Sequence, residues 1–343
     1  MMNDSRWMAS SIGTDLGNLA VFTGFEREEL QGVADNWRLE LAPALETGAD
    51  CYQIVREPWS EEAQRVYDSA RAKRAAKQAN AGAQPDGLIH QQCGHEDALV
   101  GSGGIVWIAP GRRIARVALT PDCEGPFDFE ELIGAALTHT LALVGCLPLH
   151  GMAAEIDGIG VLALGDSMAG KSTLALAILH AGGRIVSDDF LLARFKADQL
   201  VLSTLRQDLY VREGSYELIP TDLRSLFSSS GAGPGRMKLC RTLAPEAFLD
   251  ELSPQVVWFL DGTRRPSKLR ISKVSQAEAL SLLLRAGSPM FISKRYGTER
   301  VGLNPWLVHV VQLFQFFKIR PGSDLLCSPT HIMRKLLNPI VNR

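Results

Sequence analysis

The sequence is poor in cysteine, in aromatic residues and in excess charge of either sign. Six of its 343 residues are cysteine, and aromatic residues make up 7%. The cysteines are scattered, with no C-x-x-C pair, which is typical of a reducing compartment, so we expect a cytoplasmic protein that needs no disulfide bonds. The formal net charge of −2 gives no general attraction to nucleic acid or to an anionic membrane, and neither is expected as a partner.

Long hydrophobic runs and several catalytic patterns are also missing. The N-terminus has no basic segment followed by an apolar stretch, which predicts no signal peptide. The apolar stretch PWLVHVVQLFQFF at 305–317 is too short to span a bilayer, so we expect a buried helix there. Neither a G-x-S-x-G nucleophile elbow nor a G-x-G-x-x-G dinucleotide fingerprint occurs. His90, Cys93 and His95 have no matching second pair of ligands, so we expect no zinc site.

The length predicts about two domains, for which we expect the boundary at 127/128. Residues 1–127 are expected to form a small α+β region that binds a substrate or partner. Its patterns predict strands at 19–24 and 51–57, helices at 25–37 and 60–79, and a hairpin at 104–119 whose turn is at 110–112. Four of the seven residues at 71–77 are basic, which favours a solvated helical face over a docking site for an acidic peptide.

Residues 128–343 are expected to form an α/β domain. The patterns predict a helix at 128–145, a continuously apolar strand at 158–165, a helix after it, and a strand at 184–194 that contains two aspartates. Further strands are predicted at 209–214 and 256–262, a helix at 275–287, and a strand, loop and closing helix at 316–338. The segment SSSGAGPGR at 228–236 is typical of a loop.

A phosphate-binding pattern, G-x-x-x-x-G-K-[ST], lies between the apolar strand and the helix. Its residues, with the one that follows, are Gly165, Asp166, Ser167, Met168, Ala169, Gly170, Lys171, Ser172 and Thr173. The glycines permit backbone angles that turn successive N–H groups toward phosphate oxygens, and the helix N-terminus adds its positive end. The strand before the pattern and the helix after it are the context that this motif requires, so we expect a nucleotide site in which Lys171 reaches the β- and γ-phosphates and Ser172 holds Mg²⁺.

Asp188 and Asp189 end the apolar part of the strand predicted after the helix, 17 and 18 residues past Lys171. Ligands of open α/β sheets bind at the carboxyl ends of strands, so both carboxylates are expected near the phosphates. One acid can hold Mg²⁺, and the other can accept a proton from an attacking hydroxyl. A turn or cap made by an Asp pair is the structural alternative.

Together these residues resemble a known family. The His150-Gly151 pair, the G-D-S-x-x-G-K-S loop and the Asp pair stand in the same order and at similar spacing in the catalytic core of HPr kinase/phosphorylase and its relatives. The resemblance covers residues 149–190. It implies the P-loop kinase core that this family shares with phosphoenolpyruvate carboxykinase, here with a smaller β-rich N-terminal region. It also implies ATP and Mg²⁺ as cofactors and a serine-type hydroxyl of a peptide or protein as acceptor.

The same resemblance implies a role for each site residue. Lys171 and Ser172 would hold phosphate and Mg²⁺, Asp188 would be the general base, Asp189 would help to bind Mg²⁺, and His150 would lie near the transferring phosphate. Thr173 stands where the bacterial regulators have Glu, and their later glycine-rich loop is missing, so phosphorolysis and a hexamer are not expected. The LPLHG lead-in at 147–151 is similar to HPr-kinase-like proteins of ribosomal peptide pathways, including those of lasso peptides.

Phosphoryl transfer needs positive groups around the moving phosphate. The candidates for phosphate or substrate contacts are Arg212, Arg236, Lys238 and Arg241, and a surface loop with no such role is the alternative. Two further functions stay open at this stage: a kinase with a small-molecule hydroxyl as acceptor, and a nucleotide-binding scaffold that transfers nothing. The sequence does not give the oligomeric state.

Overall fold

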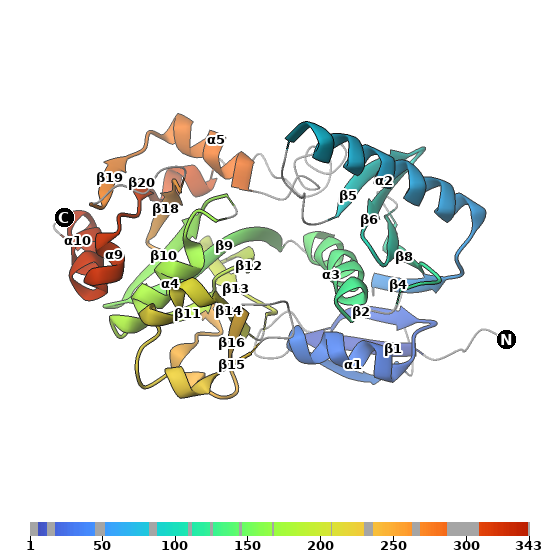
Figure 1. Cartoon of the computed structure of the whole chain (residues 1–343), viewed down its shortest axis with the longest axis horizontal. Helices are drawn as coiled ribbons and strands as arrows, with labels where there is room; N and C mark the ends of the chain where they lie inside the picture. The colour runs from blue at the N-terminus through green and yellow to red at the C-terminus, as the bar shows by residue number, and fades with distance from the viewer. Residues whose placement is uncertain are drawn as a thin grey trace. The chain divides into compact units, whose positions relative to one another are not determined.

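The computed structural model divides the chain into two compact units, Met1–Val144 and Gly145–Arg343 (Figure 1). The structure describes residues 6–11, 18–44, 52–81, 88–108, 112–123, 126–143, 146–166, 168–206, 208–229, 236–262, 268–286 and 309–341. The division falls after Val144 and not at the expected 127/128, because helix α3 (Pro126–Leu143) packs on strands of the first unit.

The first unit is built on a mixed β-sheet. In spatial order the strands are β3 (Leu39–Pro43), β1 (Arg6–Ser11), β2 (Asn18–Thr23), β4 (Tyr52–Glu57), β8 (Ile114–Leu119), β7 (Gly104–Ile108), β6 (Glu96–Val100) and β5 (Ile89–Cys93). Strands β2, β4 and β8 run parallel to one another, whereas the other neighbouring pairs are antiparallel. The hairpin predicted at 104–119 is confirmed as β7 and β8; residues 110 and 111 of its turn lie outside the described residues.

Helices cover this sheet through their apolar faces. Helix α3 packs on β2, β7 and β8 and contributes fully buried side chains such as Leu132 and Leu137. Helix α1 (Arg27–Asn36) contacts β3 and α3. Helix α2 (Glu61–Ala81) packs on β5, β6 and β7 through buried small residues such as Ala63 and Ala70. Its charged side chains that the structure describes, such as Arg71 and Lys73, are exposed, as its composition predicts.

The second unit contains the larger sheet. Its strands follow the order β17 (Glu251–Leu252), β13 (Gln199–Ser203), β12 (Phe190–Lys196), β9 (Leu147–Ile156), β10 (Ile159–Leu164), β18 (Val256–Leu260), β20 (Gln315–Arg320) and β19 (Arg270–Lys273). A further strand, β11 (Arg184–Ser187), also pairs with β9. A small antiparallel sheet is formed by β14 (Asp208–Arg212), β16 (Arg236–Cys240) and β15 (Phe227–Ser229).

Among its described residues the second unit has helices α4 (Lys171–His180), α5 (Gln276–Ala286), α9 (Asp324–Cys327) and α10 (Pro329–Val341), with 3₁₀ turns η1 (Glu213–Leu218), η2 (Arg224–Leu226) and η3 (Pro245–Ala247). Helix α4 is apolar on every side from Leu174 to Leu179, which is typical of a helix segment surrounded by core. It packs on β9, β11 and α10, and its residues from Leu174 to Leu179 are buried. The segment that follows the phosphate-binding pattern is therefore held inside the core.

Two sequence-based expectations differ from the structure. The expected helix at 305–317 is helical only over 309–313 among its described residues, and 315–317 belong to strand β20, because Phe316 and Phe317 are buried where β20 pairs with β18. The expected strand at 184–194 is interrupted, so that Asp188 and Asp189 lie between β11 and β12. In the predicted loop at 228–236, Ser228, Ser229 and Arg236 belong to strands, and 230–235 lie outside the described residues.

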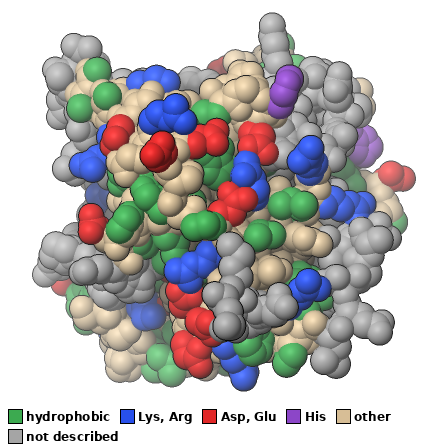
Figure 2. Space-filling model, turned by 90° about the vertical axis from the view of Figure 1, so that its right-hand side faces the viewer, with side chains coloured by type: hydrophobic (Ala, Val, Ile, Leu, Met, Phe, Trp, Pro, Cys, Tyr) green, Lys and Arg blue, Asp and Glu red, His purple; other side chains and the backbone are tan. Residues whose placement is uncertain are grey.

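Acidic and basic residues are nearly balanced in number, with 36 Lys and Arg against 38 Asp and Glu. Figure 2 shows acidic and basic side chains interspersed on one face of the molecule, in keeping with the net charge of −2. Within the described ranges, no helix is both long and apolar enough to cross a bilayer.

A substitution at Gly104 would show how tightly strands β7 and β8 of the first sheet are packed. Its φ is +151°, and a Cβ added there would collide with the carbonyl oxygen of Ala118 on the neighbouring strand. Gly94 has a φ of +60° with nothing within 4 Å of an added Cβ, so it isolates the cost of the backbone conformation. We expect Gly94→Ala to cost about 1–2 kcal/mol and Gly104→Ala to cost about 4 kcal/mol or more. Urea unfolding of the wild type and of each variant measures the two losses in the free energy of unfolding, and hydrogen exchange shows whether β7 is the strand affected in Gly104→Ala. Equal losses in the two variants would show that β7 and β8 leave room for a side chain at position 104.

Candidate active site

The phosphate-binding pattern forms a tight turn between β10 and α4. Gly170 precedes α4 with φ +104°, a left-handed conformation that favours glycine. Gly165 lies against β18, where an added Cβ would be 2.9 Å from the carbonyl oxygen of Leu260. Met168 also has a positive φ and is 71% exposed, whereas Ala169 is buried. Ser167 lies outside the described residues. The first N–H groups of α4 are thus presented at the carboxyl end of β10, as anion binding requires.

Lys171 is folded back onto the turn that precedes it. Its Nζ donates hydrogen bonds to the carbonyl oxygens of Gly165 (2.9 Å) and Asp166 (3.1 Å), and its side chain is buried. Burial lowers the pKa of the Lys171 amine, while the nearby charges of Asp189, Asp188 and Asp166 oppose that shift. The lysine and the acid pair therefore share one electrostatic environment.

Strand β9 brings the turn and the acid pair together. On one edge it pairs with β10, so that Gly151 is opposite Leu164 at the start of the turn. On its other edge His150 is opposite Phe190, and the Gly151 N–H donates to the carbonyl oxygen of Asp189 (3.0 Å). The sequence marks residues 147–151 as part of a family resemblance, but it does not show that they belong to a strand inserted between β10 and the acids.

The two aspartates occupy different environments. Asp188 is 4% exposed and accepts a hydrogen bond from Ser172. Burial, followed by the charge of Asp189, raises the pKa of Asp188 to about 7, against the opposing effects of Ser172 and Lys171. Because neutralising one member of a close carboxylate pair relieves repulsion, the other member stays ionised more easily.

Asp189 is that other member, and its side chain is 59% exposed. Desolvation opposes its ionisation. The ring of His150, whose Nδ1 lies 2.9 Å from Asp189 Oδ1, acts together with the charges of Arg206 and Lys171 to keep the pKa of Asp189 below its ordinary value. The site therefore holds one carboxyl group that titrates near neutrality and one that is a carboxylate there.

The oxygen donors of the site suit a magnesium ion. The Ser172 hydroxyl and the Asp189 carboxylate are hard oxygen ligands, and Mg²⁺ in phosphoryl-transfer sites takes one or two such groups together with water and phosphate oxygens. Asp189 is exposed enough to accept such a ligand sphere, and the Ser172 hydroxyl lies at the first turn of α4, next to Lys171.

The basic residues that the sequence suggests as phosphate or substrate contacts are not seen in contact with Lys171 or the acid pair among the described residues. Lys238 lies on β16 and its Nζ is 3.0 Å from Asp208, which raises the pKa of Lys238. Arg212 is exposed at the end of β14, and for Arg236, on β16, the structure describes the backbone only.

Arg241 is buried, unlike the surface phosphate ligand that the sequence suggests. Its Nη2 donates to the carbonyl oxygen of Val186 (2.8 Å) and its Nη1 to that of Leu249 (2.9 Å), while its guanidinium lies 4.7 Å from the ring centroid of Phe248. Arg241 thus fixes strand β11 two residues before Asp188.

Sequence reasoning missed Arg206. This residue lies three positions beyond β13, and its charge is among the influences that lower the pKa of Asp189. No local motif marks it, since only the pairing of β13 with β12 brings the segment near the acids. Thr204, two residues before it, accepts a hydrogen bond from the Arg206 N–H (3.0 Å) and donates to the Phe190 carbonyl oxygen (2.6 Å).

The raised pKa of Asp188 predicts a pH-dependent stability. Its ordinary pKa is 3.8, so the folded state prefers the neutral acid, and that contribution to stability is lost as the pH rises from about 4 through about 7. Asp188→Asn has no such group to ionise. We expect the Tm of the variant to exceed that of the wild type by about 5 °C above pH 7, with no excess near pH 4. Calorimetry across this range measures the difference, and a constant difference at every pH would contradict the assignment.

Comparisons with known proteins agree with the resemblance seen in the site. No protein-family model matches the chain. The HPr kinase/phosphorylase of Chlorobium limicola is 40% identical to it over 60 residues, which is 18% of each chain. A putative HPr kinase/phosphorylase 2 of Oceanobacillus iheyensis is 30% identical over 101 residues, which is 29% of this chain and 32% of that protein. The chain thus spans less than a third of the length of these relatives. The solved Hpr(Ser) kinase/phosphatase from Coxiella burnetii aligns with 56% of the chain and 97% of its own, at 16% identity and a TM-score of 0.30. Through these sequence matches the chain is related to the HPr kinase/phosphorylase family.

Proposed function

We propose that the chain is a kinase that transfers the γ-phosphate of ATP to a serine-type hydroxyl group of a peptide or protein. The observation that supports this most directly is the convergence of Lys171, Ser172, Asp188 and Asp189 at the amino end of one buried helix. A site that only binds nucleotide has no use for a second carboxyl group that titrates near neutral pH. The relatives named as HPr kinase/phosphorylase support the same reaction class.

Each residue has a part in the proposed transfer. The N–H groups of the turn from Gly165 to Gly170 and the amino end of α4 bind the phosphates, and the Lys171 ammonium exchanges its two carbonyl partners for phosphate oxygens. The acceptor hydroxyl attacks the γ-phosphorus in line, the bond to the β–γ bridging oxygen breaks, and ADP leaves. Magnesium, held by Ser172 and Asp189, neutralises charge on the phosphates when bound.

Asp188 is the proposed general base, because a group with a pKa of about 7 is half ionised at neutral pH and matched to proton transfer there. The exposure of the two acids favours a competing assignment, in which Asp189 is the general base. Asp189 is 59% exposed and open to a macromolecular acceptor, whereas Asp188 is 4% exposed and already contacts Ser172. His150 orients Asp189 in either case through the contact at its Nδ1.

Asparagine variants of the two acids separate these assignments. We expect Asp188→Asn to bind ATP within about twofold of the wild type and to lose phosphotransfer by about 10³-fold, because the proton acceptor is missing. Asp189→Asn should weaken Mg²⁺ binding, so that its activity is low at ordinary Mg²⁺ concentrations and recovers in part at high Mg²⁺. The measurement is a gain of about 80 Da on a serine peptide incubated with ATP and Mg²⁺. If instead Asp189→Asn is inactive at every Mg²⁺ concentration and Asp188→Asn is active, Asp189 and not Asp188 is the general base.

The same assay tests the other functions that the sequence leaves open. Phosphorylation of small hydroxyl compounds but of no peptide would support a small-molecule kinase. ADP release without any acceptor gaining mass would support a nucleotide-dependent scaffold, and both results would contradict the proposal. A ribosomal precursor peptide, such as a lasso peptide precursor, is the acceptor that the LPLHG segment at 147–151 suggests and is the first peptide to assay.

A further inference from the structure

The first unit contains a cavity that the proposed phosphotransfer does not use. Its volume is about 720 Å³, within the range of small-ligand pockets. It is lined by one face of α1, by the segments that follow β4 and β8, and by the first turns of α3. Strands β4 and β8 are parallel, so the cavity lies at the carboxyl ends of neighbouring parallel strands, where open α/β sheets bind their ligands.

Gly32 supports a binding role for this cavity. It lies within α1 and lines the cavity, and a Cβ added to it would meet no atom within 4 Å. Glycine is unfavourable inside a helix, and here neither a positive φ nor a close neighbour requires it. The missing side chain therefore leaves space that a ligand can occupy.

The charged groups that line the cavity are mostly acidic, which favours binding of a cation. The lining has one guanidinium, that of Arg56, and four carboxylates, those of Glu28, Glu29, Glu57 and Glu130. Glu130 accepts hydrogen bonds from Asn36 and Trp37, which leave its negative charge in place. Arg56 binds both oxygens of Glu29, at 2.7 and 2.8 Å, and this pair connects the wall formed by α1 to the end of β4. Even after that pair is formed, negative charge remains in excess.

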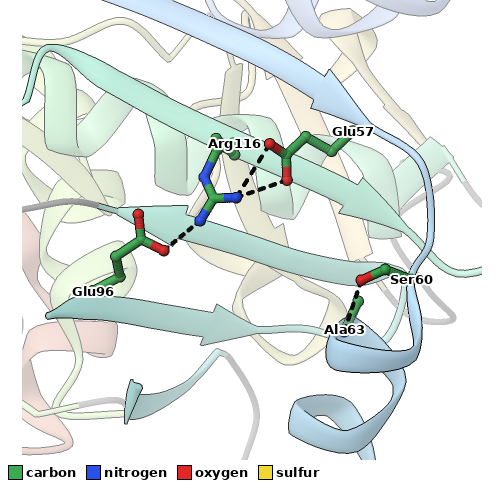
Figure 3. Close-up of polar contacts among 5 residues, drawn as sticks. All are labelled: Glu57, Ser60, Ala63, Glu96 and Arg116. Carbon is green, nitrogen blue, oxygen red and sulfur yellow. Dashed lines mark hydrogen bonds and ion pairs between the residues drawn. The ribbon is translucent and has the colours of Figure 1, made fainter. Parts of the chain in front are cut away.

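Glu57 is held in place from outside the cavity. Figure 3 shows Arg116 of β8 reaching the Glu57 carboxylate, at 3.0 and 3.1 Å, and also contacting Glu96 of β6. Arg116 therefore lies between two acids and its charge is shared by both. The Glu57 carboxylate is therefore held in position and only in part neutralised.

Apolar and aromatic groups complete the lining. Trp59 and Phe129 line the cavity together with Val33 and Leu119. The Trp59 ring is fixed by an edge contact to Tyr67 (5.5 Å between centroids) and by a hydrogen bond from its Nε1 to Gln64 (2.9 Å). Carboxylates beside aromatic rings suit a guanidinium or ammonium group on an apolar stem.

We propose that this cavity binds a basic, apolar segment of a partner peptide, with an arginine or lysine head among the glutamates and an adjacent apolar side chain against Trp59 and Phe129. A cavity of this size accommodates a few residues of a peptide, and its charge is opposite to theirs. This docking site does not depend on phosphate transfer in the second unit. If that unit is a kinase, the site would recruit acceptors by a segment separate from the serine.

The test uses the full chain without nucleotide and two fluorescein-labelled dodecapeptides. One repeats Leu-Arg-Leu-Ser, and the other has Glu in place of each Arg. We expect fluorescence anisotropy to report binding of the arginine peptide at least about tenfold tighter than that of the glutamate peptide. Gly32→Trp, which fills the cavity from α1, should weaken binding of the arginine peptide at least about tenfold, and Glu28→Gln should weaken it about threefold and reduce its salt dependence.

Matched controls separate docking from general charge effects and from misfolding. Glu278→Gln removes an exposed glutamate from the first turn of α5 in the second unit and should leave binding unchanged. Gly32→Ala shows by its Tm whether α1 accepts a side chain; if Gly32→Trp unfolds, the comparison of Glu28→Gln with Glu278→Gln decides. Equal binding of the two peptides, or equal effects of the two glutamate variants, would overturn the proposal. It would also be overturned if agmatine, a guanidinium compound without a peptide, displaced the arginine peptide at equal concentration. Since no ATP is present, these outcomes are independent of any kinase activity.

Discussion

The candidate active site depends on one strand that is paired along both edges. Strand β9 fixes the register of β10 on one side and of β11 and β12 on the other, so the phosphate-binding turn and the acid pair cannot shift relative to each other. Gly151 makes this possible, because an added Cβ would lie 2.7 Å from Leu164 Cδ2 and 3.1 Å from the Ala163 carbonyl oxygen. Interstrand hydrogen bonds thus place His150 beside Asp189 without a contribution from any ligand.

Burial then gives that geometry its chemistry. Lys171 and Asp188 are both removed from water, and burial disfavours the charged form of each, lowering the pKa of the lysine and raising that of the acid. Their mutual attraction offsets part of this cost, while Asp189 repels Asp188 and attracts Lys171. A triphosphate arriving at the turn adds negative charge beside all three groups, so it would stabilise the ammonium and favour the neutral form of Asp188 until metal compensates.

Local motifs made the turn, the helix after it and the Asp pair predictable from the sequence, since each depends on residues adjacent in the chain. The positions of β9, Arg206 and Arg241 depend instead on pairing between distant segments. Arg241 illustrates the difference: its basic character suggested a phosphate ligand, but the fold buries it on the Val186 and Leu249 carbonyl oxygens. The helix expected at 305–317 and the strand expected from 316 overlap at Phe316 and Phe317, because an apolar run does not distinguish a buried helix from a buried strand. Pairing with β18 places both residues in strand β20, as the second expectation has it. The boundary after Val144 was missed for the same reason, as only packing shows that α3 belongs to the first sheet.

The two proposed sites occupy the same architectural position in their units but differ in charge. In the second, β10 and β18 are parallel and the phosphate-binding turn follows β10; in the first, β4 and β8 are parallel and the glutamate-lined cavity follows them. The loops at such strand ends can vary without disturbing the sheet, which is why sites of opposite charge preference can be built on both. Backbone N–H groups and Lys171 make one site attractive to anions, whereas Glu28, Glu29 and Glu57 make the other attractive to cations. A peptide that is basic in one segment and contains a serine in another has chemistry suited to each.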